Sequence, residues 1–321
     1  MSRNANKPLK LSQTPGMITK SVILHLVMIA FGFVMLVPLL WTLATALTPN
    51  TKIPPTALFP PLSTITFDNF IQSWTLIGDT TGITMGRFLL NSVIVTAGIT
   101  ISGLIVASLA AYVLALKDFP LKKVFVFLAL STLMIPSQVT LVPSFLICFK
   151  GSAAFTNFCV DIFATKLGWL KADTCKNICG AITAYGTQII PFVASGLGIS
   201  LFRSHFMSVS KEIEESAKID GARNFHIYSG IVMPIAKPVI GTMTILKVMW
   251  SWNMYLWPLI AVREPQYRPL PIALDYFKGR NFNDWGYLCA AMTIVLLPMI
   301  IVFICCQRQF IGGLQAGAVK G

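Results

Sequence analysis

SKEIEESAKIDGARNFHIYSGIVMP, residues 210–234, is a polar island between two long apolar runs. Ser210 can cap a helix whose first turn holds two glutamates, where the helix dipole favours negative charge. Gly221 can end that helix in a left-handed conformation, and a second short helix is expected to stop before Pro234. A solvated charged loop is the plain alternative. The charged composition by itself is more typical of that loop, whereas two short helices at the Gly221 break would form a rigid knob, hereafter the knob, that suits insertion into a partner's groove.

The composition of the whole chain is that of an integral membrane protein. Of its 321 residues, 55% are hydrophobic and 12% are charged, with a mean hydropathy of +0.72. An ordinary soluble domain carries about 25% charged residues. The 7 Trp, 7 Tyr and 22 Phe suit aromatic belts at two membrane interfaces. One all-α membrane domain is expected, because no long polar stretch could fold separately.

Six stretches are long and apolar enough to cross a membrane as helices. They are residues 21–46, 88–115, 124–148, 179–202, 238–261 and 287–306. Polar residues and Pro191 interrupt the fourth, as expected for a helix that lines a path or packs inside a bundle. The first is far longer than a signal-peptide core, so we interpret it as an uncleaved span. The sequence predicts a polytopic bundle of six transmembrane helices.

Basic residues predict the orientation of this bundle. Lys and Arg are denser in segments 1–20, 116–123, 203–237 and 307–321 than in 47–87, 149–178 and 262–286. The positive-inside rule then places both termini in the cytoplasm and the second set of segments outside. This topology explains the net charge of +13 better than nucleic-acid binding does.

The two larger outer segments have their own expectations. Five prolines between Pro49 and Pro61 predict an irregular or extended stretch in 47–87 rather than a long helix. Segment 149–178 is polar, so we expect a peripheral extracytoplasmic loop. Its Cys159 and Cys175 could form a disulfide in an oxidising compartment, although spacing alone does not give the pairing.

Two other function classes, and metal or nucleotide sites, find little support in the sequence. The spans contain essentially none of the Asp, Glu or His that a secondary transporter or channel would need for ion coupling. A membrane enzyme is remote, because the three histidines form no metal or nucleophile pattern. Cys175 and Cys179 lack the further ligands of a metal site, and we expect none. No phosphate-binding loop pattern occurs, so another chain must bind ATP if ATP drives this protein.

One motif in the knob points to a family. Glu215-Ser-Ala217, three residues, Gly221, nine residues and then Ile231-x-Met-Pro234 resembles the EAA motif of ABC importer permeases. That motif reads Glu-Ala-Ala, x3, Gly, x9, Ile-x-Leu-Pro, so Ser216 and Met233 depart from it. Further stretches resemble the carbohydrate-uptake branch, specifically the maltose-type second permease. They are RFLLNS (87–92), SLAAY (108–112), MIPSQVTLVP (134–143), SWN (251–253), LWP (256–258), DWG (284–286), QR (307–308) and GGLQAGAVKG (312–321).

The resemblance implies a function and a set of partners. It covers residues from about 20 to the end, with an interruption at 149–180, and implies the type I importer fold. This chain would pair with a second, different permease, two ATPase subunits and an extracytoplasmic solute-binding protein in the cytoplasmic membrane of a prokaryote. It would import a sugar, or alternatively glycerol-3-phosphate or a polyol, and would not itself be an enzyme. ATP and Mg²⁺ would bind the ATPase, so this chain needs no cofactor.

The resemblance also assigns roles to residues. ATPase coupling would fall to a set within segment 203–237, in which Glu215 faces a basic residue of the ATPase cleft. The set is Glu215, Ser216, Ala217, Asp220, Gly221, Ile231 and Pro234. A cytoplasmic tail, 307–321, would contact the ATPase through Gly312, Gly313, Gly317 and Lys320. The transmembrane domain proper would span 88–306, and the loop 263–285 would probe the binding protein's sugar cleft.

Three residues of the fifth span are candidates for the transport pathway. Lys247 lies near its middle, where an ammonium costs at least about 2.5 kcal/mol on insertion scales. Lys247 therefore makes a pore-facing or inter-subunit contact, or else reaches cavity water or the carbonyl of a neighbouring helix. Trp252 and Asn253 either line the pathway or serve as belt and packing residues.

Overall fold

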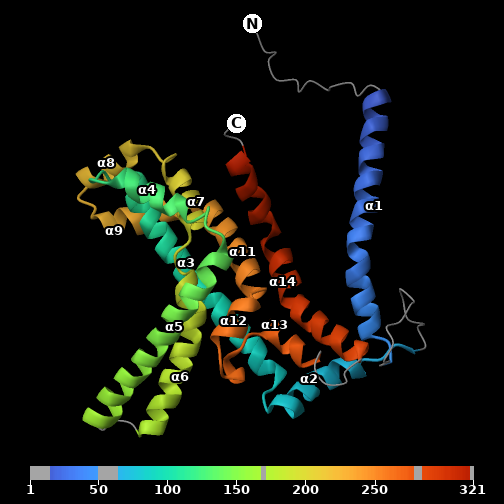
Figure 1. The fold of residues 1–321 in the computed structure, drawn as a ribbon. Coiled ribbons are helices and arrows are strands. Elements are labelled where there is room, and N and C mark those ends of the chain that lie inside the picture. The colour runs from blue at the N-terminus through green and yellow to red at the C-terminus, as the bar shows by residue number, and fades with distance from the viewer. Residues whose placement is uncertain (1–14, 50–63, 168–170, 278–283, 319–321) are drawn as a thin grey trace. The chain divides into compact units, whose positions relative to one another are not determined.

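The computed structural model describes residues 15–49, 64–167, 171–277 and 284–318, and every regular element in these ranges is helical (Figure 1). The chain divides into two compact units. One comprises residues 1–70 and 283–293, and the other comprises residues 71–282 and 294–321. The all-α fold class is confirmed.

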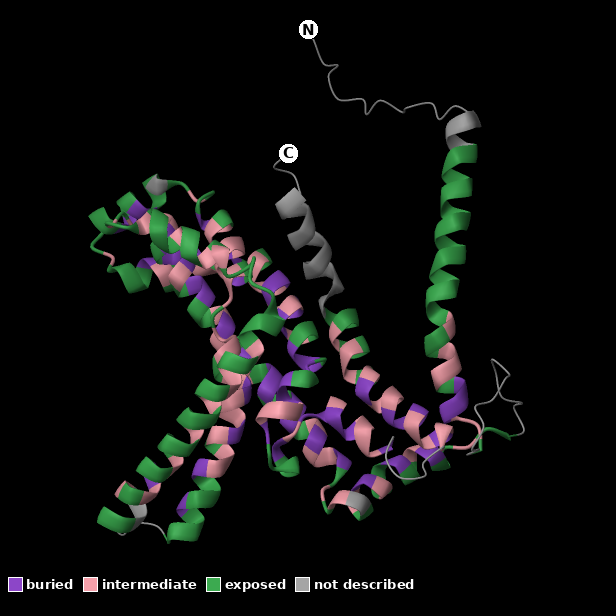
Figure 2. Ribbon diagram, viewed as in Figure 1, coloured by how far each residue is buried: buried purple, intermediate pink, exposed green. Residues whose placement is uncertain are grey.

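The first unit holds one long helix and the beginnings of two others. These are α1 (Pro15–Ala46) with the first residues of α2 (Asp68–Thr81) and of α14 (Trp285–Ala318). The apolar side chains of α1 from Val22 to Leu36 are at least half exposed, as expected for a helix that faces lipid (Figure 2). At its end, Asn69 Nδ2 donates to the carbonyls of Ala46 and Thr48 at 2.8 and 2.6 Å.

The second unit is organised around α3 (Met85–Leu116). The helix α7 (Gly196–Phe206) and the helix α11 (Lys237–Trp252) pack against it. Small residues permit this close packing, because a Cβ on Gly198 would lie 3.0 Å from Ala107 Cβ and 3.0 Å from Met243 Cε. Buried side chains near the C-terminal end of α3 include Phe202 and Phe206 of α7. They form the core on which the knob rests.

Shorter helices complete the second unit. They are α4 (Lys122–Ser131), α5 (Ser137–Cys159), α6 (Ala172–Ile189), α8 (Lys211–Ile219), α9 (Asn224–Ile227), α10 (Met233–Ile235), α12 (Leu256–Ala261) and α13 (Leu270–Ala273). Two π-helical segments, η2 (Val160–Lys166) and η4 (Tyr228–Val232), and three 3₁₀ segments, η3 (Ile190–Phe192), η5 (Pro265–Tyr267) and η6 (Leu274–Phe277), connect them. α5 and α6 form a long hairpin, in which α6 contacts α3 (Figure 1).

Within the described ranges, four helices are long and apolar enough to cross a membrane. They contain Thr19–Ala46, Met85–Leu116, Ser137–Ile162 and Trp285–Cys305. Two bent pairs could each act as a further span: Ala172–Phe192 with Gly196–Phe206, bent by 52°, and Asn224–Ile235 with Lys237–Trp252, bent by 78°. The number of spans therefore reaches six when each bent pair counts as one.

The third and fifth spans were predicted with the wrong limits. The predicted helix 124–148 is broken after α4, and the apolar helix begins at Ser137, because Pro136 disfavours helical geometry in the residue before it. The predicted helix 238–261 ends at Trp252, where Asn253 leaves the helical conformation and α12 follows as a separate short helix. Apolar composition continued across both breaks and concealed them.

Both outer segments contain helix where loops were predicted. The segment 47–87 includes α2, which has 14 residues, while residues 50–63 with four of the five prolines lie outside the described ranges. The segment 149–178 is not a loop, because α5 and η2 run through it to Lys166 and α6 begins at Ala172. Packing between the two arms of the hairpin stabilises helix that the polar composition did not indicate.

Three cysteines lie between the arms of this hairpin. Cys159, Cys175 and Cys179 are buried together as free thiols, with 4.0 Å between the sulfur atoms of Cys175 and Cys179. A disulfide between Cys159 and Cys175 is thus not formed. In the part of the chain that the structure describes, no group of three His, Cys, Asp or Glu could hold a metal ion.

Candidate functional site

The first arm of the knob, α8, is built as the sequence predicts. Ser210 Oγ accepts a hydrogen bond from the backbone N–H of Glu212 at 3.3 Å. Gly221 ends the helix with φ of +81°. Its N–H donates to the carbonyl of Lys218 at 3.0 Å, and the N–H of Ala222 donates to that of Ala217 at 2.9 Å, which is a Schellman motif. The left-handed conformation predicted for Gly221 is confirmed.

The second arm differs from the expectation. It was predicted to stop before Pro234, but α9, η4 and α10 continue without a break to Ile235. The chain bends by 78° only at Ala236, which leads into α11. Proline is tolerated here because it lies in the first turn of α10, where its missing N–H costs little, directly after a π-helical turn.

The knob packs on the core of the second unit. Ala217 of α8, Ile227 of α9, Val232 of η4 and Ala236 are buried in the same cluster as Phe206. α8 and α9 therefore lie together at one end of α3 (Figure 1). The knob is a fixed part of the unit rather than a solvated loop.

The motif residues divide between the surface and this core. Ala217 is buried and Ile231 is half-buried, while the others are exposed: Glu215, Ser216, Asp220, Gly221 and Pro234. Two exposed apolar side chains that the sequence reasoning missed flank the Gly221 turn. Ile219 is 86% exposed and Phe225 is 72% exposed. The outer surface of the knob thus combines carboxylates with two bare hydrophobic groups, a combination that fits a protein partner.

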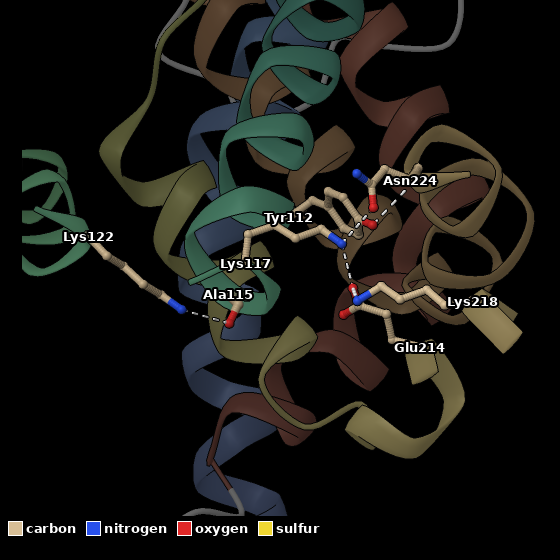
Figure 3. Close-up of polar contacts among 7 residues, drawn as sticks. All are labelled: Tyr112, Ala115, Lys117, Lys122, Glu214, Lys218 and Asn224. Carbon is tan, nitrogen blue, oxygen red and sulfur yellow. Dashed lines mark hydrogen bonds and ion pairs between the residues drawn. The ribbon is translucent and has the colours of Figure 1, made fainter. Parts of the chain in front are cut away.

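A polar cluster around the buried Glu214, which sequence reasoning also missed, connects the knob to the end of α3 (Figure 3). Glu214 points inward and forms ion pairs with Lys117 and, at 2.8 Å, with Lys218. The Lys117 ammonium also donates to Asn224 Oδ1 at 2.9 Å. It lies 5.1 Å from the centre of the Tyr112 ring, whose hydroxyl donates to the Asn224 carbonyl at 3.3 Å.

The helical period could have indicated the inward direction of Glu214. It precedes the small residue Ala217 by three positions and so shares its face, whereas Glu215 does not. Its partner Lys117 lies 97 residues earlier in the chain, and no spacing signal connects the two.

The electrostatics of the cluster keep its two central groups charged. Burial by itself would raise the pKa of Glu214, but hydrogen bonds from Lys117 and Lys218 hold that pKa below its ordinary value. Burial would likewise lower the pKa of Lys117, but its bond to Glu214 and its contact with Tyr112 leave it raised. At neutral pH the cluster is therefore an ion pair.

The candidate pathway residues lie in different environments. Lys247 is buried, and its ammonium donates to the Phe192 carbonyl at 2.8 Å, at the bend between α6 and α7. Trp252 is buried and donates to the Val295 carbonyl at 3.1 Å, while the exposed Asn253 donates to Met249 of its own helix. Within this chain Lys247 thus contacts a neighbouring helix carbonyl, one of the alternatives left by the sequence. Roles in a pathway stay predictions.

The segment after α12 is fastened to α3 far from the knob. Asn91 Nδ2 donates to the carbonyls of Gln266 and Arg268 at 2.8 and 2.9 Å. Ser92 Oγ accepts from the N–H of Leu270 at 2.7 Å. Residues 278–283 of the predicted binding-protein loop lie outside the described ranges.

The predicted ATPase-contact tail is only partly described. α14 extends to Ala318, so the backbone of Gly312, Gly313 and Gly317 is helical. Lys320 lies outside the described residues. The contact of this tail with an ATPase stays a prediction.

Comparison with known proteins places the chain in a family. Residues 103–313 match the model of the family described as "Binding-protein-dependent transport system inner membrane component". The probable ABC transporter permease protein YurM of Bacillus subtilis is 31% identical, with 94% of this chain and 87% of the relative covered. The arabinooligosaccharides transport system permease protein AraQ of Halalkalibacterium halodurans is 29% identical, with 94% and 99% covered.

Two further comparisons bear on the substrate and the fold. The sn-glycerol-3-phosphate transport system permease protein UgpE of Brucella suis is 24% identical, with 90% of this chain and 94% of the relative covered. A solved bacterial ABC transporter involved in the import of the acidic polysaccharide alginate is 19% identical, has a TM-score of 0.71, and is matched over 95% of this chain and all of that one.

The chain belongs to the binding-protein-dependent transport family, and it is an inner-membrane permease component. Its predicted resemblance to the carbohydrate-uptake branch and its type I importer fold are confirmed. Its relatives are transport permeases rather than enzymes.

Proposed function

We propose that this chain is one of two permease subunits of an ATP-driven importer that carries a sugar across the cytoplasmic membrane of a prokaryote. The second permease is a different chain, two ATPase subunits bind the cytoplasmic side, and a solute-binding protein delivers the sugar from outside. Membership of the binding-protein-dependent family and the similarity to AraQ along nearly the whole chain support this proposal.

The observation that carries the proposal is the knob itself. It presents Glu215, Ile219 and Phe225 on the outside while its inner face is anchored to the core of the second unit. An aromatic and an aliphatic anchor surrounded by charge are the elements of an interface hot spot. The knob enters a groove of an ATPase subunit, and closure of the ATPase dimer then rocks the permease as a rigid body.

ATP and Mg²⁺ belong to the partner in this scheme. The sequence has no phosphate-binding loop, so this chain supplies movement and a pathway rather than nucleotide chemistry. The knob and both termini lie in the cytoplasm, in agreement with the distribution of Lys and Arg. The tail after residue 307 adds a second ATPase contact.

A sugar is the favoured substrate class, and glycerol-3-phosphate or a polyol is the alternative. The arabinooligosaccharide permease is the more similar relative, at 29% against 24% identity. Because the binding protein selects the substrate before the permease meets it, this chain carries only part of the specificity.

The proposal is tested with the complex of both permeases, ATPase and binding protein in liposomes. Uptake of radiolabelled arabinotriose, raffinose and sn-glycerol-3-phosphate is measured together with ATP hydrolysis. Uptake of either sugar supports the proposal, and uptake of sn-glycerol-3-phosphate alone would select the alternative. Transport without ATP would contradict the importer assignment.

The same liposomes test the knob. Glu215→Lys places a cation where the ATPase cleft is expected to be basic, so ATPase retention should fall at least about fivefold. Lys166→Glu, at an exposed ion pair with Asp161 at the end of the hairpin, is the control and should retain the ATPase. Equal retention for Glu215→Lys and the parent would contradict a docking role for this face.

A further inference from the structure

Two adjacent glutamates of α8 have opposite surroundings. Glu215 is exposed, whereas Glu214 is only 7% exposed and is held by two ammonium groups. The first residue faces a partner, and the second faces the interior of its own chain. The resemblance to the family accounts for Glu215 and leaves Glu214 without a role.

The main partner of Glu214 stands at the end of the central helix. Lys117 is the residue directly after α3, and its backbone N–H still donates to the Val113 carbonyl at 3.1 Å. Its ammonium bonds Glu214 before the Gly221 turn and Asn224 after it (Figure 3). One cation therefore connects α3 to both arms of the knob.

Most of the remaining attachment of the knob is apolar, apart from two neutral hydrogen bonds with α3: Ser108 Oγ with the Tyr228 hydroxyl at 2.8 Å, and the Tyr112 hydroxyl to the Asn224 carbonyl at 3.3 Å. Ala217, Ile227 and Val232 pack on the core, and such contacts are non-directional. A charge-assisted hydrogen bond fixes direction and distance, and its strength in a partly buried site makes rotation of the knob costly. Lys117 adds the charge-assisted restraint, which is stronger than the two neutral hydrogen bonds and which apolar packing does not supply.

α3 is suited to carry a displacement across the membrane. Its 32 residues span about 48 Å at 1.5 Å per residue. Near its other end, Asn91 and Ser92 hold the segment 266–270. A knob locked to α3 is thus connected through one rigid helix to the opposite side of the unit.

We propose that Lys117 is a positioning residue that locks the knob to α3 through Glu214 and Asn224, so that a displacement of the knob by the ATPase moves α3. This inference rests on the proposed function and deepens it. Without the lock, the ATPase still docks on the exposed face, but part of its movement is lost as rotation of the knob. The expected defect is loss of coupling with docking intact.

The chain offers variants that separate this role from simple stability. In Lys117→Met the apolar stem is kept and Glu214 still pairs with Lys218, so no buried charge is left unpartnered. Lys117→Arg restores the cation. Lys122→Met is the matched control, because Lys122 lies five residues away and pairs with the 86% exposed carboxylate of Asp118.

The experiment uses liposomes with the complete complex and measures the substrate imported per ATP hydrolysed and the ATPase retained relative to the parent. The substrate is whichever of arabinotriose, raffinose or sn-glycerol-3-phosphate the parent imports. We expect Lys117→Met to import at least about fivefold less substrate per ATP hydrolysed, with ATPase retention within about twofold of the parent. Lys117→Arg should recover most of the ratio, and Lys122→Met should match the parent. The double exchange of Lys117→Glu with Glu214→Lys should import more substrate per ATP hydrolysed than either single change.

The outcomes are separable from those for the docking face. If Lys117→Met imports as much substrate per ATP as the parent, the proposed locking role of Lys117 is wrong, even when Glu215→Lys releases the ATPase. If Lys117→Met loses assembly and neither Lys117→Arg nor the charge exchange recovers it, the residue is structural only and the inference also fails. If Glu215→Lys has no effect on ATPase retention, the docking role of the exposed face fails, whatever Lys117→Met does.

Discussion

Gly221 is constrained by its backbone and not by its neighbours. Its φ is +81°, yet a Cβ placed on it would meet no atom within 4 Å. The only free-energy cost of a side chain at this position is therefore that of the left-handed conformation, about 1–2 kcal/mol for an L-residue. The turn that orients the two arms of the knob depends on this single conformation.

Gly221→Val should consequently weaken ATPase retention more than Gly221→Asn, because asparagine tolerates the left-handed region and a β-branched residue does not. Retention in detergent pull-downs and the thermal unfolding midpoint provide the measurement. Gly230→Ala is the control, since Gly230 has no positive φ and lies on the same knob. Equal effects of the Val and Asn variants would show that the conformation of Gly221 does not matter.

The ion pair between Lys117 and Glu214 predicts a pH profile. The pKa of Glu214 is lowered from 4.5, so its contribution to stability is present above that value and is lost as pH falls through the lowered pKa. The pKa of Lys117 is raised from 10.5, so its contribution is present below that value and is lost as pH rises through the raised pKa.

The difference in unfolding midpoint between the parent and Glu214→Gln should therefore stay constant from about pH 6 to 9 and shrink only below about pH 4.5. Thermal unfolding of the detergent-solubilised complex across this range gives the measurement. A difference that changes near neutral pH would contradict the assignment of charges in the cluster.

At the level of elements, α3 and α7 approach through small residues. A Cβ on Gly198 would contact Ala107 and Met243 at 3.0 Å, and both of these side chains belong to the core under the knob. Larger side chains at this position must separate the helices. The contact therefore determines whether the knob has a surface to rest on.

Gly198→Leu should destabilise the permease by about 1–3 kcal/mol through overpacking. Gly151→Leu on α5 should not, because a Cβ on Gly151 meets no atom within 4 Å. The fraction of monodisperse protein in detergent and its unfolding midpoint are the measurements. If both variants behave alike, the closeness of α3 and α7 is not a determinant of stability.

At the level of the whole molecule, the proposed topology assigns a side to each connection. Single cysteines at Pro120, Thr165, Asp220 and Glu264, in a variant without the native cysteines, provide accessible probes. A membrane-impermeant maleimide applied to intact cells should label positions 165 and 264 and leave 120 and 220 unlabelled, because only the first two lie outside. Labelling of position 220 in intact cells would place the knob on the wrong side for an ATPase.

Several properties of this protein follow from sequence alone because they are local. Apolar runs of sufficient length predict spans, and Ser210 and Gly221 define the ends of α8 through a capping side chain and a backbone preference. The knob and the membrane class need no knowledge of distant contacts. The pathway and tail residues remain predictions, since a partner chain would define them.

Tertiary structure decided what depends on residues far apart in the chain. Apolar composition concealed the end of α11 at Trp252, and it also concealed the break before Ser137, for which Pro136 is a local signal. Packing between α5 and α6 stabilises helix in segment 149–178, although that segment is polar. Lys218, four positions later on the same helix, is a local partner for the buried Glu214, but the second cation, Lys117, lies 97 residues away and only the fold brings it to the carboxylate.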